Sequence, residues 1–332
     1  MSLLAVVGSR EAAIGFPDPT VYPVGLNWLA TEKGTTLAGT IQLGDNLPIL
    51  KTIPSASIPL IYIDPPFNTG KQQQRTRIQT TASENGTRRG FQGRTYETKI
   101  VGSLAFDDAF DDFLGFLEPR LVEAYRLLTP NGSMYLHLDY REVHYAKVLM
   151  DSIFGRECFL NEIIWAYDYG ARSKERWPAK HDNILVYVKD PKSYVFNFDA
   201  MERIPYMAPG LVGAEKAALG KTPTDTWWHT IVPTNGKERT GYPTQKPVGI
   251  LKRIVDVSSR PDDVVLDFFA GSGTTGEAAV RCGRRFHLID SSVDAMKVMA
   301  KRFQIYPGIT WCGFDPATVA DPVTVPQASL FG

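Results

Sequence analysis

The segment Val264–Thr275, VVLDFFAGSGTT, predicts a short apolar strand, a glycine turn and the first turn of a helix. Gly271 and Gly273 let the backbone approach a ligand closely, and the helix N-terminus that follows offers free N–H groups to an anionic group. Asp290 ends the next apolar run, where a carboxylate can accept hydrogen bonds from ribose hydroxyls. A turn of this kind suits a dinucleotide or another adenosine ligand. On these residues alone, a plain tight turn with a surface aspartate stays open as an alternative.

A second segment, Ile63–Phe67 (IDPPF), directly follows the apolar run Leu60–Ile63. Two prolines hold the chain rigid at the carboxyl end of a predicted strand, where open α/β sheets place their ligands. Asp64 and the carbonyl of Pro65 are hydrogen-bond acceptors beside the aromatic ring of Phe67. Two acceptors and a flat ring suit a planar group that carries an exocyclic amine. A proline-stiffened loop with a solvated aspartate is the alternative.

Apolar runs and helical periods alternate along the rest of the chain. The expected strands cover residues 60–63, 134–138, 163–167, 184–188, 264–267 and 286–290, and the expected helices cover residues 113–128, 139–154, 248–258 and 274–282. Between residues 196 and 241 the periodicity is lost, which indicates an insertion. Strand–helix alternation of this kind predicts an α/β fold with a mostly parallel sheet and helices on both faces.

The composition is that of an ordinary globular protein. The chain has 332 residues, 43% of them hydrophobic, with 36 basic and 36 acidic side chains. No apolar run reaches the roughly 18 residues of a membrane span, and residues 1–8 lack the features of a signal peptide. Cys158, Cys282 and Cys312 are far apart, which excludes a disulfide framework and a CxxC metal site. We therefore expect a cytoplasmic protein with no metal centre.

Positive charge gathers in one stretch of this neutral chain. From Lys71 to Lys99 there are seven basic and two acidic residues, among many Gln, Thr and Gly residues without an apolar period. We predict a mobile basic loop over residues 70–102, since long loops without structure are usually functional or disordered. A solvated loop without a partner is the alternative.

Taken together, the motifs resemble those of the amino-group DNA methyltransferases, which transfer a methyl group from S-adenosylmethionine to N6 of adenine or N4 of cytosine. Asp64–Phe67 matches the family's catalytic motif D-P-P-[YF], and Phe269–Gly273 matches its cofactor motif F-x-G-x-G. The catalytic motif comes first, which is typical of the permuted β-type arrangement. Gly241–Pro247 resembles the segment that encloses the methionine end of the cofactor, Leu43–Asp45 the element that reaches its adenine, and His181–Tyr187 a further family strand.

This resemblance implies a fold and its subdivision. The fold is a Rossmann-like, doubly wound and mostly parallel sheet of seven strands. The expected parts are an N-terminal extension (1–36), a catalytic half (37–195) with the basic loop (70–102), a target-recognition insertion (196–241), a cofactor-binding half (242–312) and an extended C-terminal tail (313–332). Phe268 stands where the family usually has proline, so we expect altered packing there without loss of function.

Roles for individual residues follow from the same resemblance and from the basic segments. The expected catalytic residues are Asp64, Pro65, Pro66 and Phe67. The expected cofactor-binding residues are Asp45, Lys246, Pro247, Asp267, Phe269, Gly271, Gly273, Thr274 and Asp290. The expected DNA-binding residues are Arg75, Arg77, Arg88, Arg89, Arg172, Lys174, Arg176, Lys237 and Arg239. Trp227 and Trp228 are either DNA contacts or core of the insertion.

The chemistry implied is the methylation of a flipped base. Asp64 and the Pro65 carbonyl would accept the two amine protons of a base stacked on Phe67, directing the nitrogen lone pair towards the sulfonium methyl group. No histidine is assigned a catalytic role, because the proton becomes acidic once the methyl group is attached. Asp64 favours adenine, since N4-cytosine enzymes more often carry serine there. N4-cytosine methylation, protein glutamine methylation and a catalytically silent DNA-binding protein stay open as alternatives.

The end of the chain carries a further motif. Gln327–Phe331, Q-A-S-L-F, resembles the pentapeptide by which bacterial replication and repair proteins bind the sliding clamp. Docking of Leu330 and Phe331 on the enzyme's own surface, or in a homodimer, is the alternative. The partners we expect are double-stranded DNA, the clamp and a second copy of the chain, with a nucleoid-associated location in the cytoplasm.

Overall fold

The computed structural model describes residues 39–66, 73–82, 88–89, 95–106, 112–168 and 172–319, and between 73 and 106 it describes the backbone alone. The N-terminal extension (1–36), Phe67 and the clamp-like segment Gln327–Phe331 therefore lie outside the described residues. Among the described residues, no helix is long and apolar enough to cross a membrane.

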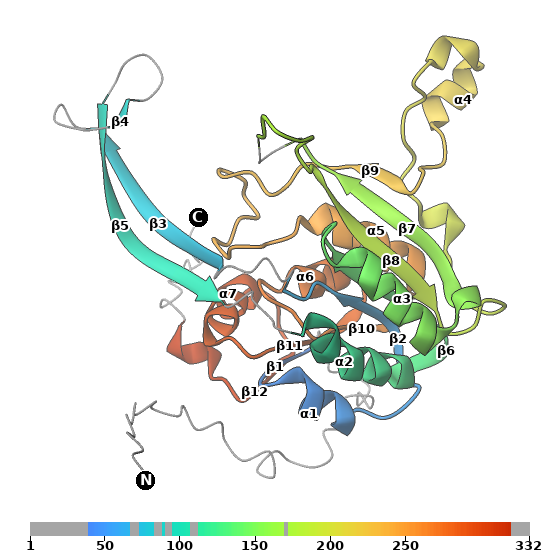
Figure 1. Cartoon of the computed structure of the whole chain (residues 1–332), viewed down its shortest axis with the longest axis horizontal. Coiled ribbons are helices and arrows are strands. Elements are labelled where there is room, and N and C mark those ends of the chain that lie inside the picture. The colour runs from blue at the N-terminus through green and yellow to red at the C-terminus, as the bar shows by residue number, and fades with distance from the viewer. Residues whose placement is uncertain are drawn as a thin grey trace, which may run out of the picture.

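The core of the molecule is a sheet of nine strands in the order β12-β1-β11-β10-β2-β6-β8-β7-β9 (Figure 1). The strands in that order are β12 (Ile309–Cys312), β1 (Gly39–Leu43), β11 (Arg285–Asp290), β10 (Val264–Asp267), β2 (Ile58–Ile63), β6 (Leu128–Leu138), β8 (His181–Val188), β7 (Phe159–Ala166) and β9 (Thr226–Trp228). Only β8 runs antiparallel to its neighbours, β6 and β7. The predicted mostly parallel, doubly wound sheet is confirmed.

The predicted number of seven strands is wrong, because a short strand is added at each edge of the sheet. β12 pairs with β1, and β9 pairs with β7. These strands have four and three residues, too few to leave a hydrophobic period in the sequence.

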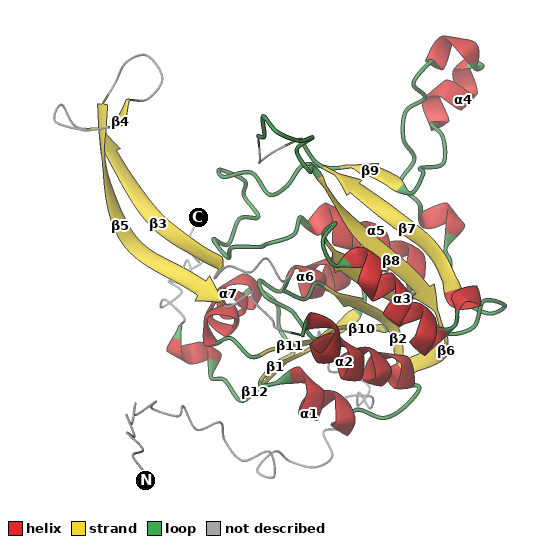
Figure 2. Ribbon diagram, viewed as in Figure 1, coloured by secondary structure: helices red, strands yellow, loops and turns green. Residues whose placement is uncertain are grey.

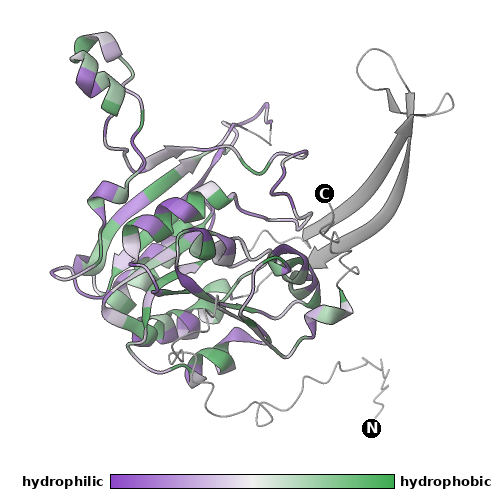
Figure 3. Ribbon diagram, turned by 180° about the vertical axis from the view of Figure 1, so that it is seen from behind, coloured by the Kyte–Doolittle hydropathy of each residue, from purple (hydrophilic) through white to green (hydrophobic). Residues whose placement is uncertain are grey.

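Two layers of helices cover the two faces of the sheet (Figure 2). The first layer contains α1 (Asn46–Thr52), α2 (Phe113–Leu127) and α3 (Val143–Phe154), and the second contains α5 (Val248–Ser258), α6 (Thr274–Arg281) and α7 (Val293–Phe303). Successive side chains along β2 point to opposite faces of the sheet and so pack against both layers. Ile61 and Ile63 pack with the first layer, and Leu60 and Tyr62 pack with the second. Hydrophobic residues accordingly follow the central strands and the helix faces against them (Figure 3).

Within the segment predicted as a structureless basic loop, residues 70–102, the described residues belong to an antiparallel ribbon. β3 (Gln73–Ala82) pairs with β5 (Thr95–Phe106), from Gln73 opposite Phe106 to Ala82 opposite Tyr96, and the short β4 (Arg88–Arg89) adds to β5. The ribbon stands away from the body of the molecule (Figure 1). Its strands are joined by backbone hydrogen bonds, which require no apolar period, so the sequence pattern did not reveal them.

Residues 196–241, the segment expected to be an insertion, consist mainly of irregular segments. It contains α4 (Ala214–Leu219), which projects from the body on the side opposite the ribbon, and β9, which extends the edge of the central sheet (Figure 1). Trp227 is half-buried, its indole N–H donating to the carbonyl of Thr224 at 3.0 Å, whereas Trp228 is 75% exposed. Trp227 therefore packs partly against the protein, whereas Trp228 lies at the surface.

Candidate active site

The catalytic and cofactor motifs meet at one edge of the sheet. β2 and β10 are parallel neighbours, with Leu60 opposite Val265 and Ile61 opposite Leu266. Because parallel strands end at the same edge, the residues after β2 and after β10 face one another. Both groups line a cavity of about 1520 Å³, which is larger than the 300–1,000 Å³ of most single-ligand pockets.

The carboxylate of Asp64 is held by a lysine from the other half of the chain. The ammonium Nζ of Lys246 lies 2.5 Å from Asp64 Oδ2, and their side chains are only 10% and 15% exposed. The second oxygen, Oδ1, is buried and has no hydrogen-bond partner among the described residues. A buried acceptor without a partner is uncommon and indicates a group that a ligand can satisfy.

The glycine turn after β10 has the backbone geometry that its sequence predicts. Gly271 and Gly273 have φ values of +49° and +75°, in the left-handed region that disfavours other residues. A Cβ atom at Gly273 would lie 2.8 Å from side-chain atoms of Met299 and Phe303, so α7 packs directly against the turn.

Two hydrogen bonds connect this turn to the rest of the site. The N–H of Gly271 donates to Asp290 Oδ2 at 2.7 Å. The hydroxyl of Thr274 donates to the backbone carbonyl of Lys246 at 3.1 Å. Lys246 therefore contacts the cofactor turn through its backbone and the catalytic motif through its side chain.

Buried carboxylates dominate the electrostatics of the cavity. Burial, together with the charges of Asp64 and Asp290, raises the pKa of Asp267 to about 7, although two hydrogen bonds to its carboxylate oppose this shift. Asp267 accepts hydrogen bonds from the Thr275 hydroxyl at 2.6 Å and from the N–H of Phe269 at 3.0 Å. Burial also raises the pKa of Asp290. A cation bound between these groups would relieve their mutual repulsion.

At the β1 end of the cavity, a chain of polar contacts connects α1 to the cofactor turn. Asp45 caps α1 and pairs with Arg120 at 3.0 Å. Arg120 also donates to Asn46 at 2.6 Å, and Asn46 donates to the carbonyl of Phe268 at 2.7 Å. The side chain of Phe268 is fully buried in the core.

A buried network that the sequence analysis missed lies at the β6–β8 end of the cavity. The Tyr62 hydroxyl lies 2.8 Å from His137 Nδ1, and His137 Nε2 lies 3.2 Å from Asp182. The Tyr167 hydroxyl donates to the other oxygen of Asp182 at 3.0 Å. Burial, followed by the charge of Asp64, raises the pKa of Tyr62 well above its usual value. No local motif joins these residues, because they come from four different strands or strand ends.

Comparisons with known proteins agree with this geometry. A family model described as DNA methylase (N6_N4_Mtase) matches residues 58–302. DNA adenine methyltransferase YhdJ of Escherichia coli (strain K12) is 32% identical over 281 residues, covering 81% of this chain and 83% of that protein. This chain belongs to the N6/N4 DNA methylase family. It is a DNA methyltransferase with S-adenosylmethionine as its methyl donor.

A further relative and one solved structure extend the comparison. The type II methyltransferase M.HpaI of Haemophilus parainfluenzae is 28% identical over 283 residues, covering 82% of this chain and 78% of that protein. The solved structure of PvuII DNA methyltransferase, described as cytosine-N4-specific, has a TM-score of 0.57 at 16% identity, covering 86% of this chain and 91% of that one. At that identity, the PvuII structure supports the fold alone.

Most residues expected to bind base or cofactor lie at the methyltransferase cavity. Its lining includes Asp45, Asp64, Pro65, Pro66, Lys246, Asp267, Phe269, Gly271, Thr274 and Asp290. Gly273 and Pro247 do not line it: Gly273 precedes α6 as its N-cap, and Pro247 precedes α5 as its N-cap.

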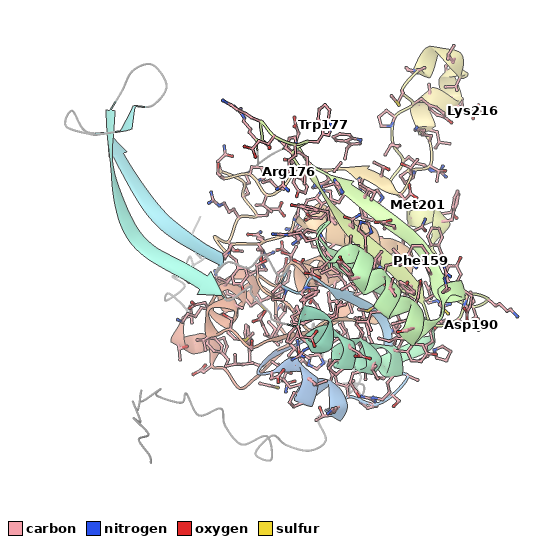
Figure 4. All side chains as sticks on the ribbon, viewed as in Figure 1. Phe159, Arg176, Trp177, Asp190, Met201 and Lys216 are labelled. Atoms are coloured by element: carbon pink, nitrogen blue, oxygen red, sulfur yellow. The ribbon has the colours of Figure 1, made fainter. Side chains whose placement is uncertain are left out.

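The residues expected to bind DNA are distributed over several parts of the methyltransferase. Arg172, Arg176 and Arg239 line the cavity, and Lys174 is exposed on the same β7–β8 connection as the first two. Arg176 and the 96% exposed Trp177 mark the outer end of that connection (Figure 4). Lys237 lines a separate cleft. The side chains of Arg75, Arg77, Arg88 and Arg89 lie outside the described residues.

Proposed function

We propose that this methyltransferase transfers a methyl group to the exocyclic N6 amine of an adenine flipped out of double-stranded DNA, at specific sites. The observation that carries the proposal is the convergence of Asp64, with its unpartnered Oδ1, and the Gly271 turn on one cavity. The adenine specificity draws support from the DNA adenine methyltransferase YhdJ, which is 32% identical, and from the aspartate at position 64.

The acidic groups on the cofactor side fit S-adenosylmethionine. When bound, this cofactor supplies a methyl group activated by a sulfonium cation. Asp290 and Asp45 would bind its hydroxyl and amino groups as hydrogen-bond acceptors, while Asp267 holds the turn through Phe269 and Thr275. Burial raises the pKa of both Asp267 and Asp290, so a cationic ligand beside these two carboxylates is favoured over an anionic one.

Asp64 and Pro65 would act on the target amine. The amine nitrogen of adenine is a poor nucleophile, because its lone pair is delocalised into the ring. Acceptance of the two amine protons by Asp64 Oδ1 and the Pro65 carbonyl localises that lone pair and stabilises the positive charge that develops on nitrogen. Holding the amine in line with the transferred methyl group adds a proximity contribution. Stacking of the base on Phe67, which lies outside the described residues, stays a prediction.

We assign Lys246 the role of a positioning residue. Of the two carboxylate oxygens of Asp64, the Lys246 ammonium contacts Oδ2, at 2.5 Å. Oδ1 is thereby left to accept a hydrogen bond from the target amine. Its backbone carbonyl accepts the hydrogen bond of Thr274, so that the same residue aligns the base side with the cofactor side.

Cations at the entrance of the cavity would hold the DNA while the base is extruded. Arg172 and Arg176 from the β7–β8 connection and Arg239 from the insertion all line the cavity. Extrusion of a base costs a few kcal/mol, which contacts of arginines with phosphates can offset. The cavity volume of about 1520 Å³ accommodates a base and a cofactor side by side.

Nucleoside analysis tests the proposal and its main alternative. DNA methylated by the purified enzyme is digested to nucleosides, and the methylated nucleoside is identified. We expect N6-methyladenine. N4-methylcytosine would assign the enzyme to the alternative specificity. Genome-wide mapping of methylated bases with and without the gene would then define the recognised sequence.

We also propose that the tail segment Gln327–Phe331 binds the bacterial sliding clamp, which would bring the enzyme to newly replicated DNA in the nucleoid. Binding of a peptide covering residues 319–332 to purified clamp should be measurable and should be lost on Leu330→Ala plus Phe331→Ala. Absence of binding by the intact peptide would remove the clamp from the partners. Sedimentation of the full chain would show whether a homodimer forms.

A further inference from the structure

A second concave site lies outside the catalytic cavity. It has a volume of about 800 Å³ and is bounded by α6, by α7 and by the insertion segment 233–240. Arg239 lines both this cleft and the catalytic cavity, so the two adjoin. We call it the α6–α7 cleft.

Cations outnumber acids in the α6–α7 cleft. Its basic lining residues are Lys237, Arg239, Arg281, Lys297, Lys301 and Arg302, and its acidic ones are Glu238, Glu277 and Asp294. The charges compensate one another only in part.

Ion pairs account for half of the cations. Glu277 is shared between Arg281 and Arg302, and Asp294 pairs with Lys297 at 3.0 Å. Lys237 and Lys301 are exposed and have no ion-pair partner among the described residues. The cleft thus keeps a surplus of positive charge, which attracts anions.

Arg302 provides a second, independent observation. Its side chain is only 3% exposed, and Nη1 pairs with Glu277. Its Nε and Nη2 donors have no hydrogen-bond partner among the described residues. The guanidinium fork is the side-chain geometry best matched to two oxygens of one phosphate group. A buried guanidinium with unused donors, at the wall of a cationic cleft, indicates a site for an oxyanion.

We propose that the α6–α7 cleft binds phosphate groups of the DNA backbone next to the nucleotide that is flipped into the catalytic cavity. The shared position of Arg239 places the cleft beside the path of a duplex held at that cavity. The inference rests on the proposed function, since it takes the duplex to lie across the cavity mouth.

The test compares two lysines that differ in position. Lys301→Ala removes an exposed, unpaired cation from the cleft, and Lys51→Ala, the matched control, removes an exposed cation from α1 on the other helix layer. DNA binding is measured by fluorescence anisotropy over a series of salt concentrations. One lost phosphate contact lowers the slope of log K against log salt by about 0.9.

We expect a slope smaller by about 0.9 for Lys301→Ala and by about twice that for Lys237→Ala plus Lys301→Ala. The Lys51→Ala control should keep both the wild-type slope and the wild-type kcat at saturating DNA. Equal slopes for Lys301→Ala and Lys51→Ala would overturn the proposal.

A second arm separates backbone phosphate from free phosphate. Inorganic phosphate is titrated into the DNA-free enzyme at constant ionic strength, and thermal stability is followed. Stabilisation that depends on Lys301, together with an unchanged DNA slope, would make the cleft a small-anion site and refute the DNA assignment. Failure of the proposed adenine specificity would appear only in the nucleoside analysis, so the two failures are distinguishable.

Discussion

The catalytic cavity and the α6–α7 cleft adjoin, yet they are built on opposite principles. The cavity lies at strand ends and holds buried carboxylates, one of which has its pKa raised to about 7 by burial. The cleft lies between helices and holds cations, several of them exposed. Desolvated groups interact strongly with a ligand and are sensitive to geometry, whereas exposed charges act over longer distances and are screened by salt. Buried groups therefore serve the chemistry, whereas mainly exposed cations, in the cleft and at the cavity entrance, serve the docking of DNA.

The largest expected effect comes from the catalytic aspartate. Asp64→Ala removes the acceptor for the amine proton, so kcat should fall by at least the order of 10²–10³-fold that loss of one transition-state hydrogen bond costs. Cofactor affinity, measured by calorimetric titration, should persist, as should the salt slope of DNA binding. Near-normal turnover would exclude Asp64 from the mechanism. It would also contradict the proposed difference between a catalytic cavity and a docking cleft.

Lys246 should come next, because it acts on the reaction through Asp64. Loss of a hydrogen bond to a charged group is worth about 1.5–3 kcal/mol, so Lys246→Met should lower kcat roughly 10- to 150-fold. Lys246→Arg keeps a cation and should restore part of the rate. If the methionine variant instead weakens cofactor binding with kcat unchanged, Lys246 serves the cofactor and not Asp64.

Substitution of Asp290 tests whether an acidic residue of the catalytic cavity acts differently from one in the α6–α7 cleft. Asp290→Ala should weaken cofactor binding by up to about 150-fold, since its carboxylate also holds the N–H of Gly271. The matched control is Asp294→Ala, which removes an acid from the α6–α7 cleft. That variant should leave cofactor affinity unchanged and strengthen DNA binding slightly. Equal effects of both variants on cofactor affinity would contradict the placement of Asp290.

The pH dependence of the free energy of unfolding tests the raised pKa of Asp267. Its folded-state pKa is raised to about 7, above the value of 3.8 for an unperturbed side chain. Between these values the folded state binds more protons than the unfolded state, so this group's contribution to stability is full below pH 4 and is lost as pH rises to 7. Each pH unit corresponds to 1.36 kcal/mol, so the loss between pH 5 and 7 is about 2 kcal/mol.

Asp267→Asn removes this titration while keeping an acceptor for the N–H of Phe269. Urea unfolding of both proteins at pH 5 and 7 should show a smaller fall in the free energy of unfolding for the variant. An identical fall in the two proteins would mean that Asp267 ionises normally.

The strands beneath the site could be predicted because each is an apolar run followed at once by its functional residues. This pattern gave β2 before Asp64, β10 before the Gly271 turn and β11 before Asp290. It follows from the physics of a buried parallel sheet, in which side chains on both faces are apolar and ligands bind beyond the carboxyl ends.

Other features left weaker signals or none. The contact between Asp64 and Lys246 joins residues 182 positions apart, and neither motif predicts the other's orientation. The ribbon of β3 and β5 has no apolar period. For α7, by contrast, a signal was present: Ser292 as N-cap and apolar residues at helical spacing, Ala295, Met296, Met299 and Phe303. That helix forms one wall of the α6–α7 cleft, so the cleft could not be predicted without it.

The adjacency of β2 and β10 also has a consequence for biosynthesis. Leu60 and Val265 pair in the sheet although more than 200 residues separate them along the chain. At roughly 5–20 residues per second, β2 leaves the ribosome about 10–40 s before its partner is made. During that interval one edge of the catalytic strand is open to pairing with other chains, a known route to aggregation. Catalytic competence is then among the last properties that the nascent chain acquires, and chaperone demand should peak while β10 is still being synthesised.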